Sequence, residues 1–353
     1  MQHGTRRGAL MGGRASTDEC GPAVSPWVRD LHQAPRLSAA VVGGSGRLGS
    51  WLTRQLTGAG HHVRVVDAQP PSPMPRMRFV RCDLGGQESL PAGLFTGCDV
   101  VFHLAALHGA HLVGGTDRRR FWAVNVNGTQ AVVEAALRDG VRRLVLAGST
   151  SVYGAGSPAG PALVLDESSP LRPEDIYDLT KVAAEQLVQR AAEAGLEGVT
   201  LRFGRFFFGS QSGYHLRKLS TGLDVTDACQ ALVRSALAPA LPRRAYCVAS
   251  DLPLDRADRA RLGEDATAVL RERFPRLVEA AQRLGLALPD RVGKSVCSDA
   301  LRQDLGYAPE RTLEWVTDAW ARHHARARPQ PRRALQHEVS PLLAGVLPAV
   351  SPC

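Results

Sequence analysis

The sequence predicts an α/β protein in which parallel strands form a doubly wound sheet, with a smaller lobe toward the C-terminus. Segments of strand type alternate with segments of helix type over residues 38–209, and this alternation requires crossover connections that make the strands parallel. A glycine-rich loop separates the first of these strands from the first helix. The composition, 44% hydrophobic and 22% charged residues, excludes a disordered or fibrous chain.

The elements follow from the residue types along the chain. Ser38–Val42 is a short run of small and β-branched residues, which favours a strand, and a helix is expected from Leu48 to Leu56. The later strands are expected over residues 63–67, 79–84, 99–105, 143–147 and 199–203, and the later helices over 121–137 and 177–194. The pattern contains no visible internal repeat.

The two ends of the chain differ from this central part. Residues 1–37 and 325–353 mix Gly, Ser, Pro and Arg without a period, so we expect a flexible N-terminal extension and a flexible basic C-terminal tail. Residues 38–209 are expected to form the larger domain, which holds the alternating strands and helices. Residues 210–324 are expected to form a small lobe interleaved with the last elements of that domain. One or two amphipathic helices are expected over 255–288, and a final helix over 313–320.

The net charge of +9 suggests a nucleic-acid partner, but its distribution does not support one. Residues 1–37 carry +2 and residues 321–353 carry +4, which leaves +3 for the 283 residues between them. No basic stripe interleaved with aromatic residues lies in that central part, so we expect no nucleic-acid binding. Lysine is scarce. Only Lys181, Lys218 and Lys294 occur, so each one warrants inspection.

The cysteines and the hydropathy pattern bear on the compartment. Seven cysteines occur, an odd number, and none forms a Cys-x-x-Cys pair, so we expect reduced thiols with neither a disulfide framework nor a metal site. No apolar run approaches the roughly 20 residues of a membrane span. These features predict a cytoplasmic protein without a membrane partner.

The loop Gly43-Gly44-Ser45-Gly46-Arg47-Leu48-Gly49 predicts a dinucleotide site. It follows a strand, opens a helix and precedes Asp67 by 18 positions, counted from Gly49. Glycines let the backbone approach a pyrophosphate at the positive end of the helix, so Gly43, Gly46, Arg47, Leu48 and Gly49 are expected cofactor-binding residues. Asp67 can accept hydrogen bonds from a ribose 2′-hydroxyl and repels a 2′-phosphate, which favours NAD. A plain tight turn is the alternative. The expected sheet is therefore of the Rossmann type.

Two further strand ends are expected to contact the cofactor. Asp83 and Leu84 end the third strand, where Asp83 can meet an adenine amino group, although a helix cap is the alternative. Leu104, Ala105 and Ala106 end the fourth strand, and their small size lets a dinucleotide lie against the sheet edge. His103 is interpreted as a core histidine.

Tyr177 and Lys181 stand four residues apart, on one face of the predicted helix. A tyrosine with its ordinary pKa of about 10 is a poor base at neutral pH. A neighbouring ammonium and a positive nicotinamide ring are expected to lower that pKa. A surface pair is the alternative interpretation. Upstream, Ser149 lies in a hydroxyl-rich turn at a strand end, where a substrate oxygen can be held.

These motifs together resemble the extended short-chain dehydrogenase/reductase family, the NAD-dependent epimerase/dehydratase group. The resemblance rests on the glycine loop, Asp67, residues 103–106, 125–129, 149–154 and 177–181, in family order and spacing, and covers about residues 38–320. It implies that Tyr177 is the acid/base, that Lys181 orients the nicotinamide ribose and tunes the tyrosine, and that Ser149 binds the reacting oxygen. Asn125, on the long predicted helix, is expected to brace the backbone of the site through a water molecule, with a buried structural asparagine as the alternative. The resemblance also implies that two long helices pair two copies into a homodimer.

Three departures from the family pattern bear on the substrate. Thr150 and Ser151 replace the Asp-Glu pair of family dehydratases, which disfavours dehydration and leaves two hydroxyls for substrate binding. Arg205 replaces the asparagine typical of nucleotide-sugar enzymes, and its planar fork suits a carboxylate or phosphate, with a structural salt bridge as the alternative. Only residues 210–223 separate Gly209 from the next family motif, a stretch much longer in nucleotide-sugar enzymes. Arg217 in this short stretch is a further candidate anion ligand.

The leading functional hypothesis is an NAD-dependent enzyme that acts on a secondary alcohol of a sugar or sugar nucleotide, in the manner of a 4-epimerase. An NAD-dependent dehydrogenase of a sugar, uronate or polyol is the first alternative, favoured by Arg205 and the short segment. A non-catalytic dinucleotide sensor is the second alternative. Sensors usually lose the tyrosine and the lysine, and Tyr177 and Lys181 are both present.

Overall fold

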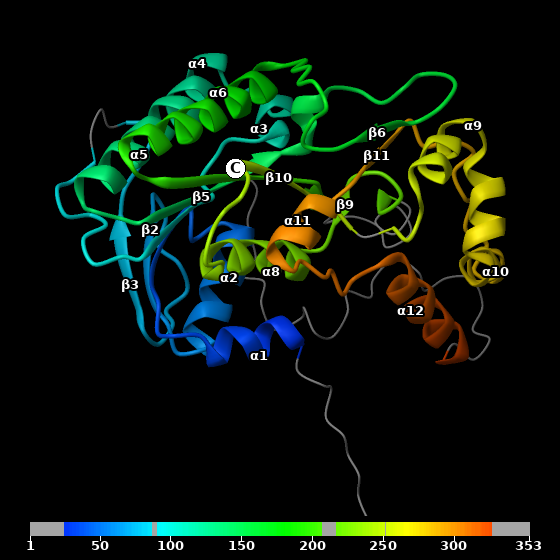
Figure 1. Ribbon diagram of the computed structural model, residues 1–353, viewed down its shortest axis with the longest axis horizontal. Coiled ribbons are helices and arrows are strands. Elements are labelled where there is room, and N and C mark those ends of the chain that lie inside the picture. Colours follow the sequence, from blue (N-terminus) through cyan, green and yellow to red (C-terminus); the bar gives the residue numbers. More distant parts are fainter. Residues whose placement is uncertain (1–24, 87–89, 207–216, 251, 327–353) are drawn as a thin grey trace, which may run out of the picture.

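A seven-stranded parallel sheet forms the centre of the molecule, as a computed structural model of residues 25–86, 90–206, 217–250 and 252–326 shows (Figure 1). The strand order is β10-β7-β5-β4-β1-β2-β3, and every neighbouring pair is parallel. The strands are β1 (Ser38–Val42), β2 (His62–Asp67), β3 (Met77–Arg81), β4 (Val100–His103), β5 (Arg143–Ser149), β7 (Glu197–Phe203) and β10 (Ala245–Val248). This confirms the predicted doubly wound, Rossmann-type sheet.

The strand order reverses at β1, which lies between β2 and β4. Val42 is in register with Val66 of β2 on one side and with His103 of β4 on the other. The carboxyl ends of the three strands therefore meet at one edge of the sheet. Ligands of doubly wound folds bind in the crevice at such a reversal, so this edge is where a nucleotide is expected.

Helices cover both faces of the sheet. One face carries α2 (Arg47–Gly58), α8 (Val225–Leu237), α11 (Asp299–Leu305) and α1 (Pro26–Gln33), whose apolar residues share one core cluster with the strands. The other face carries α5 (Gly128–Arg138) and α6 (Ile176–Arg190), which share a second cluster. Burial of both faces explains why β1, β4 and β5 are apolar almost throughout.

The helix predicted over residues 121–137 consists of three pieces. They are α4 (Arg118–Trp122), one π-helical turn over Ala123–Asn127, and α5. Such turns accommodate one extra residue and are frequent at functional sites. Here the turn carries Asn125. A short helix, α3 (Gly109–Val113), precedes this group.

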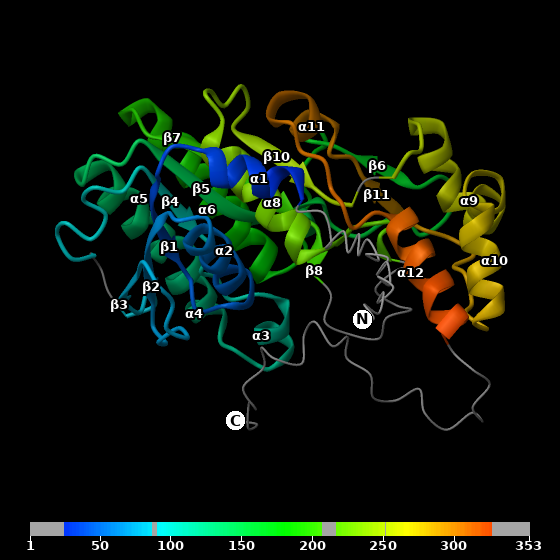
Figure 2. The same ribbon diagram turned by 90° about the horizontal axis from the view of Figure 1, so that it is seen from below.

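The smaller lobe lies beside the carboxyl end of the sheet, at the right of Figures 1 and 2. Its helices are α9 (Arg256–Arg273), α10 (Pro275–Arg283) and α12 (Leu313–Arg326), which enclose a separate apolar core. Pro275 begins α10 and explains why the predicted helical region 255–288 divides there. None of the described helices combines the length and the apolarity that a membrane span requires.

The lobe is interleaved with the larger domain. In one small sheet, β6 (Leu163–Leu165) pairs in parallel with β11 (Lys294–Val296). In a second one, β8 (Arg205–Phe206) pairs with β9 (Gly222–Leu223). Because β6 comes from the first half of the chain, the lobe includes a segment from within the predicted domain 38–209.

The N-terminal extension is shorter than predicted. Residues 26–33 were expected to be flexible, but they form α1, which contacts α8. Trp27 is 2% exposed and Leu31 is fully buried. Two apolar side chains on one face of a short helix are enough to anchor it. Residues 1–24 and 327–353 lie outside the described residues.

Candidate active site

The glycine loop fits against the backbone that follows β4. Gly43 has φ +83°, and a Cβ atom there would lie 2.5 Å from the backbone nitrogen of Ala105. A Cβ on Gly49 would lie 2.2 Å from the carbonyl oxygen of Gly43. Helix α2 begins at Arg47, within the loop, and no side chain caps its first turn. The loop therefore leaves backbone donors at the positive end of a helix, which is the arrangement that a pyrophosphate requires.

Asp67 lies beside this loop, at the end of β2. Its carboxylate oxygens accept hydrogen bonds from the backbone nitrogens of Ser45 and Gln69, both at 3.0 Å. The side chain is held but remains partly exposed. Each carboxylate oxygen has a second lone pair, so Asp67 can still accept from a ribose hydroxyl. The loop and Asp67 together fit a dinucleotide with an unmodified 2′-hydroxyl.

The other predicted cofactor residues occupy the same edge of the sheet. Asp83 is exposed, its side chain accepts from the Gly85 nitrogen at 3.0 Å, and Arg120 lies 3.7 Å away. Leu84 is 7% exposed. Leu104 and Ala105 are partly exposed, and both backbone nitrogens donate to the Val42 carbonyl. Asp83 thus holds its own turn, and its role toward adenine remains a prediction.

Asn125 braces the segment after β4. Its side-chain oxygen accepts from the Leu107 nitrogen at 2.8 Å, and its amide nitrogen donates to the Leu107 carbonyl and to the Thr180 hydroxyl, both at 3.0 Å. The side chain is 1% exposed. The contact with the site backbone is therefore direct and ties α6 to the same segment.

His103 is buried beneath this edge, as expected of a core histidine. The Thr129 hydroxyl donates its only proton to the Asn125 carbonyl at 2.6 Å, so it must accept from His103 Nε2, 2.9 Å away. The imidazole proton is therefore on Nε2. Nδ1 has no hydrogen-bond partner among the described residues. Burial, together with the nearby Lys181 charge, lowers the pKa of His103 to about 3, so the ring is neutral.

Tyr177 and Ser149 come together where β5 ends and α6 begins. Ser149 is the last residue of β5, and Asp175 caps α6 by accepting from the Asp178 nitrogen at 2.9 Å. Burial raises the pKa of Tyr177 above its ordinary value. A hydrogen bond with Ser149 and the charge of Arg205 oppose that rise, while Asp178 and Asp175 add to it.

Lys181 lies one helical turn after Tyr177. Its Nζ donates to the Ala147 carbonyl at 2.8 Å and lies 6.0 Å from the centre of the Tyr177 ring. Burial lowers the pKa of Lys181 to about 8. The expectation that Lys181 lowers the tyrosine pKa differs from the structure, in which burial and two neighbouring carboxylates prevail. An ammonium has three donors, so Lys181 can still bind a ribose.

Two of the predicted substrate residues, Arg205 and Ser151, are accessible and interact with Tyr177 or Ser149. Arg205 is exposed on β8, and its charge influences Tyr177. Ser151 is partly exposed and lies 2.7 Å from Ser149, between the hydroxyl oxygens. Thr150 is 4% exposed, which limits its access to a substrate, and Arg217 is exposed beyond the undescribed residues 207–216. The roles of Thr150 and Arg217 remain predictions.

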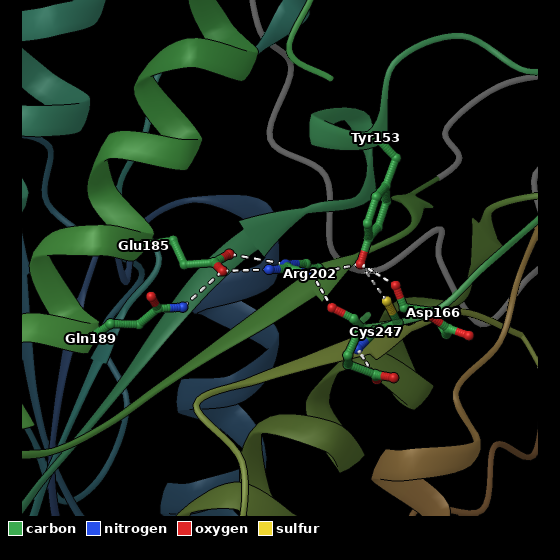
Figure 3. A network of polar contacts seen from close by, with 7 residues as sticks. Tyr153, Asp166, Glu185, Gln189, Arg202 and Cys247 are labelled. Carbon is green, nitrogen blue, oxygen red and sulfur yellow. Dashed lines mark hydrogen bonds and ion pairs between the residues drawn. The ribbon is translucent and has the colours of Figure 1, made fainter. Parts of the chain in front are cut away.

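A buried ion pair joins β7 to α6 and is hydrogen-bonded with the turn after β5 (Figure 3). Arg202 of β7 donates to both carboxylate oxygens of Glu185 on α6, at 3.0 and 2.5 Å. Its third nitrogen donates to the Tyr153 hydroxyl at 2.6 Å, and Tyr153 donates to the Asp166 carbonyl at 2.9 Å. Tyr153 ends the turn that begins after Ser149. The pair therefore links β7, the turn that follows Ser149, and α6, the helix that carries Tyr177 and Lys181.

Two charged residues near Tyr177 were not assigned from the sequence. Asp178 is 5% exposed and follows Tyr177 directly. Lys294, on β11, donates to the Gly154 carbonyl, and it interacts electrostatically with Asp178, Glu174 and Arg205. The scarcity of lysine was the only signal for Lys294, because β11 lies more than 100 residues further along the chain. An acidic residue beside the catalytic tyrosine was the signal for Asp178.

The sheet, the glycine loop and the tyrosine–lysine pair fit a dinucleotide-binding protein. The family model described as "NAD dependent epimerase/dehydratase family" matches residues 39–220. The chain belongs to this family, and its cofactor is NAD, as Asp67 predicted.

Individual relatives differ in how much of the chain they match. The dTDP-6-deoxy-L-talose 4-dehydrogenase (NAD(P)(+)) of Kitasatospora kifunensis is 29% identical over 82% of this chain and 96% of its own length. A 3 beta-hydroxysteroid dehydrogenase/Delta 5-->4-isomerase of Mycobacterium tuberculosis is 36% identical over 45% of this chain and 43% of its own length. The chain spans only 40–45% of the length of the first curated relatives that it matches.

A solved structure shares the fold over most of the chain. MoeE5 in complex with UDP-glucuronic acid and NAD is 24% identical, with a TM-score of 0.57 over 81% of this chain and 99% of that one. This likeness concerns the arrangement of the elements, including the small lobe.

Proposed function

We propose that this protein oxidises a secondary alcohol of an acidic sugar or sugar nucleotide, with net transfer of a hydride to NAD. The observation that carries the proposal is the convergence of Ser149, Tyr177 and Arg205 at the end of β5. Two hydroxyl groups that can bind the reacting oxygen therefore lie near Arg205, a cation with an exposed side chain.

NAD, when bound, supplies the hydride acceptor. The glycine loop between β1 and α2 would hold its pyrophosphate, and Asp67 its adenine ribose. Lys181 is placed to bind a hydroxyl of the second ribose with the donors that Ala147 leaves free. Asn125 keeps the segment after β4 in position by its two bonds to Leu107.

The reacting alcohol would be held by two hydroxyls. Ser149 would orient the substrate oxygen, and Tyr177, as the phenolate, would take the proton from that oxygen as the alcohol becomes a carbonyl. In the reverse direction Tyr177 returns the proton. General acid–base help of this kind contributes about 10²- to 10⁴-fold to a rate.

The charge around Tyr177 supports an acidic substrate. Arg205 is a planar donor fork that suits a carboxylate or a phosphate, and Lys294 adds a second cation in electrostatic contact with Arg205. The relative matched over nearly its whole length is a sugar-nucleotide 4-dehydrogenase. The hydroxysteroid dehydrogenases match less than half of the chain, so they bear less on the substrate.

A 4-epimerase is the second candidate, because the family that matches the chain includes epimerases. Such an enzyme would return the hydride to the opposite face of the carbonyl, with no net change of cofactor. A dinucleotide sensor is disfavoured, since both Tyr177 and Lys181 lie at the site.

We also propose a homodimer. Trp122 on α4 is 46% exposed and Leu179 on α6 is 45% exposed. The two helices contact each other, so these apolar side chains belong to one face of the molecule. A second copy of the chain would remove both side chains from water.

The test uses purified full-length protein with NAD and a panel of uronates, acidic and neutral sugar nucleotides and a hydroxysteroid. We expect NADH absorbance to rise with an acidic sugar, and Tyr177→Phe to lower the rate about 100-fold or more. Tyr246→Phe is the matched control, because Tyr246 bonds to Asp304, away from this site. Sugar inversion without NADH would establish the epimerase instead. An unchanged rate in Tyr177→Phe, or a response to the hydroxysteroid alone, would overturn the proposal.

A further inference from the structure

Asp178 is a buried carboxylate that the catalytic scheme above does not use. It stands directly after Tyr177 in the first turn of α6, yet its side chain is turned inward and is 5% exposed. Asp175 caps this helix by accepting from the Asp178 backbone nitrogen. One carboxylate oxygen of Asp178 accepts from the Glu174 nitrogen at 3.2 Å. The carboxylate also accepts a hydrogen bond from Ser151.

Hydroxyl groups connect this carboxylate with Tyr177. The Ser151 and Ser149 hydroxyl oxygens are 2.7 Å apart, and Ser149 in turn is hydrogen-bonded with Tyr177. The Ser151 backbone nitrogen also donates to the Ser149 hydroxyl at 3.1 Å, which fixes the turn. Four side chains thus form one chain of contacts, from the phenol to the carboxylate.

The direction of donation along this chain follows from proton counting. An ionised carboxylate only accepts, and a serine hydroxyl has one proton to donate. When Asp178 is ionised, Ser151 therefore donates to it, Ser149 donates to Ser151, and Tyr177 donates to Ser149. The opposite direction requires a protonated Asp178 and a Tyr177 phenolate. In both directions one of the two end groups, Tyr177 or Asp178, is protonated and the other is ionised.

We propose that Asp178 is a positioning residue that shares one proton with Tyr177 through Ser149 and Ser151. In the transfer, the Tyr177 proton passes to Ser149, the Ser149 proton to Ser151, and the Ser151 proton to Asp178. Each serine gains one proton and loses one, so only the chain ends change charge. Asp178 thereby takes up the proton that the substrate alcohol gives to Tyr177. This use of the chain rests on the proposed acid/base role of Tyr177.

The charges around the two ends favour such sharing. Burial raises the pKa of both Tyr177 and Asp178, so neither end readily exists with its charge while the other is also charged. The charged groups that face the pair are Glu174 and Asp175 at the start of α6, Lys181 on the same helix, Arg205 on β8 and Lys294 on β11. Arg205 stabilises negative charge on the phenolate and Asp175 opposes it, while Glu174 and Asp175 oppose negative charge on Asp178.

The chain of hydrogen bonds and a purely electrostatic effect of Asp178 predict different results for Ser151→Ala. If the chain exists, Ser151→Ala frees the Ser149 proton to be donated to Tyr177, which stabilises the phenolate although the Asp178 charge remains. If only charge matters, Ser151→Ala leaves the tyrosine unchanged. Ser151 is therefore the more decisive position, and Asp178→Asn is the second variant.

The experiment titrates the Tyr177 phenolate by ultraviolet absorbance in the full-length protein without substrate. Each variant is compared with the same variant carrying Tyr177→Phe, which isolates Tyr177 among the five tyrosines. We expect Ser151→Ala and Asp178→Asn each to raise the acid dissociation constant of Tyr177 about tenfold or more, or roughly 1.4 kcal/mol. Asp175→Asn is the control, because it removes a nearby charge outside the chain and keeps the helix cap. Its effect should be clearly smaller.

An unchanged Tyr177 titration in Ser151→Ala, with a native circular dichroism spectrum, would overturn the chain. Equal shifts in Asp178→Asn and Asp175→Asn would reduce Asp178 to one charge among several and would overturn it as well. The titration involves no substrate, so it stands or fails independently of the proposed dehydrogenase activity.

Discussion

Glu185→Gln should be among the most destabilising single changes in the chain, because it leaves a buried guanidinium without its counter-ion. Arg202 and Glu185 are 5% and 4% exposed, and two hydrogen bonds join them. The neutral amide keeps the shape of the carboxylate but can accept only through one atom. Removing one partner of a buried pair costs about 3–5 kcal/mol. With an unfolding entropy of about 2.1 cal/mol/K per residue, that is a fall in Tm of roughly 4–8 °C for a chain of this length.

Urea denaturation followed by circular dichroism measures this cost directly. The matched control is Glu279→Gln, which removes a carboxylate from an exposed pair with Arg283 four residues further along α10. That change should cost about 0.5 kcal/mol or less. If Glu185→Gln also costs below about 1 kcal/mol, the ion pair does not hold the turn and α6 together, and the reasoning drawn from Figure 3 fails.

Three other predictions concern the cofactor, the buried lysine and the assembly. Gly49→Ala should weaken NAD binding at least about tenfold in calorimetry, because its Cβ would lie 2.2 Å from the Gly43 carbonyl; unchanged affinity would contradict the assigned site. Lys181→Met should be more stable than wild type by roughly 2–3 kcal/mol at pH 7. Lys181 has a pKa of about 8 in the folded protein, below its ordinary value of 10.5. The free energy of unfolding of the wild type therefore rises with pH between those two values, and the advantage of the variant shrinks. A difference in urea midpoints that stays constant over this pH range would refute this. Trp122→Glu with Leu179→Glu should convert a dimer to a monomer in sedimentation, and an unaltered mass would exclude this face.

The sheet was predictable because its signals are local. Residues 38–42 were predicted and observed as one strand, and the strands predicted at 63–67 and 199–203 differ from the observed ones by two residues at most. Buried parallel strands are apolar throughout, so their pattern stands out from the helices. The strand over residues 245–248 was not predicted, since it is short and has no glycine loop or family motif beside it.

The candidate site was predictable only where one motif carried the chemistry. Tyr177, Lys181 and Ser149 were found because each lies in a short pattern whose context fits. The tyrosine pKa was expected to fall, and it rises, because the sequence does not reveal that the ring is packed near two carboxylates while the ammonium bonds elsewhere. Burial and distance are properties of the fold, and they determine the sign of the shift.

The three lysines lie at positions where burial makes an ammonium differ from a guanidinium. Lys181 is 5% exposed and Lys218 is 1% exposed, and Lys294 is also partly buried, so none occupies the open surface where arginine serves equally well. An ammonium is compact and its pKa falls readily on burial, as burial lowers the pKa of all three here. A guanidinium at position 181 would stay charged and would not fit beside the Ala147 carbonyl in the same way. Lys181→Arg should therefore impair catalysis even though it preserves the positive charge, and full activity in this variant would show that charge alone is what the site requires.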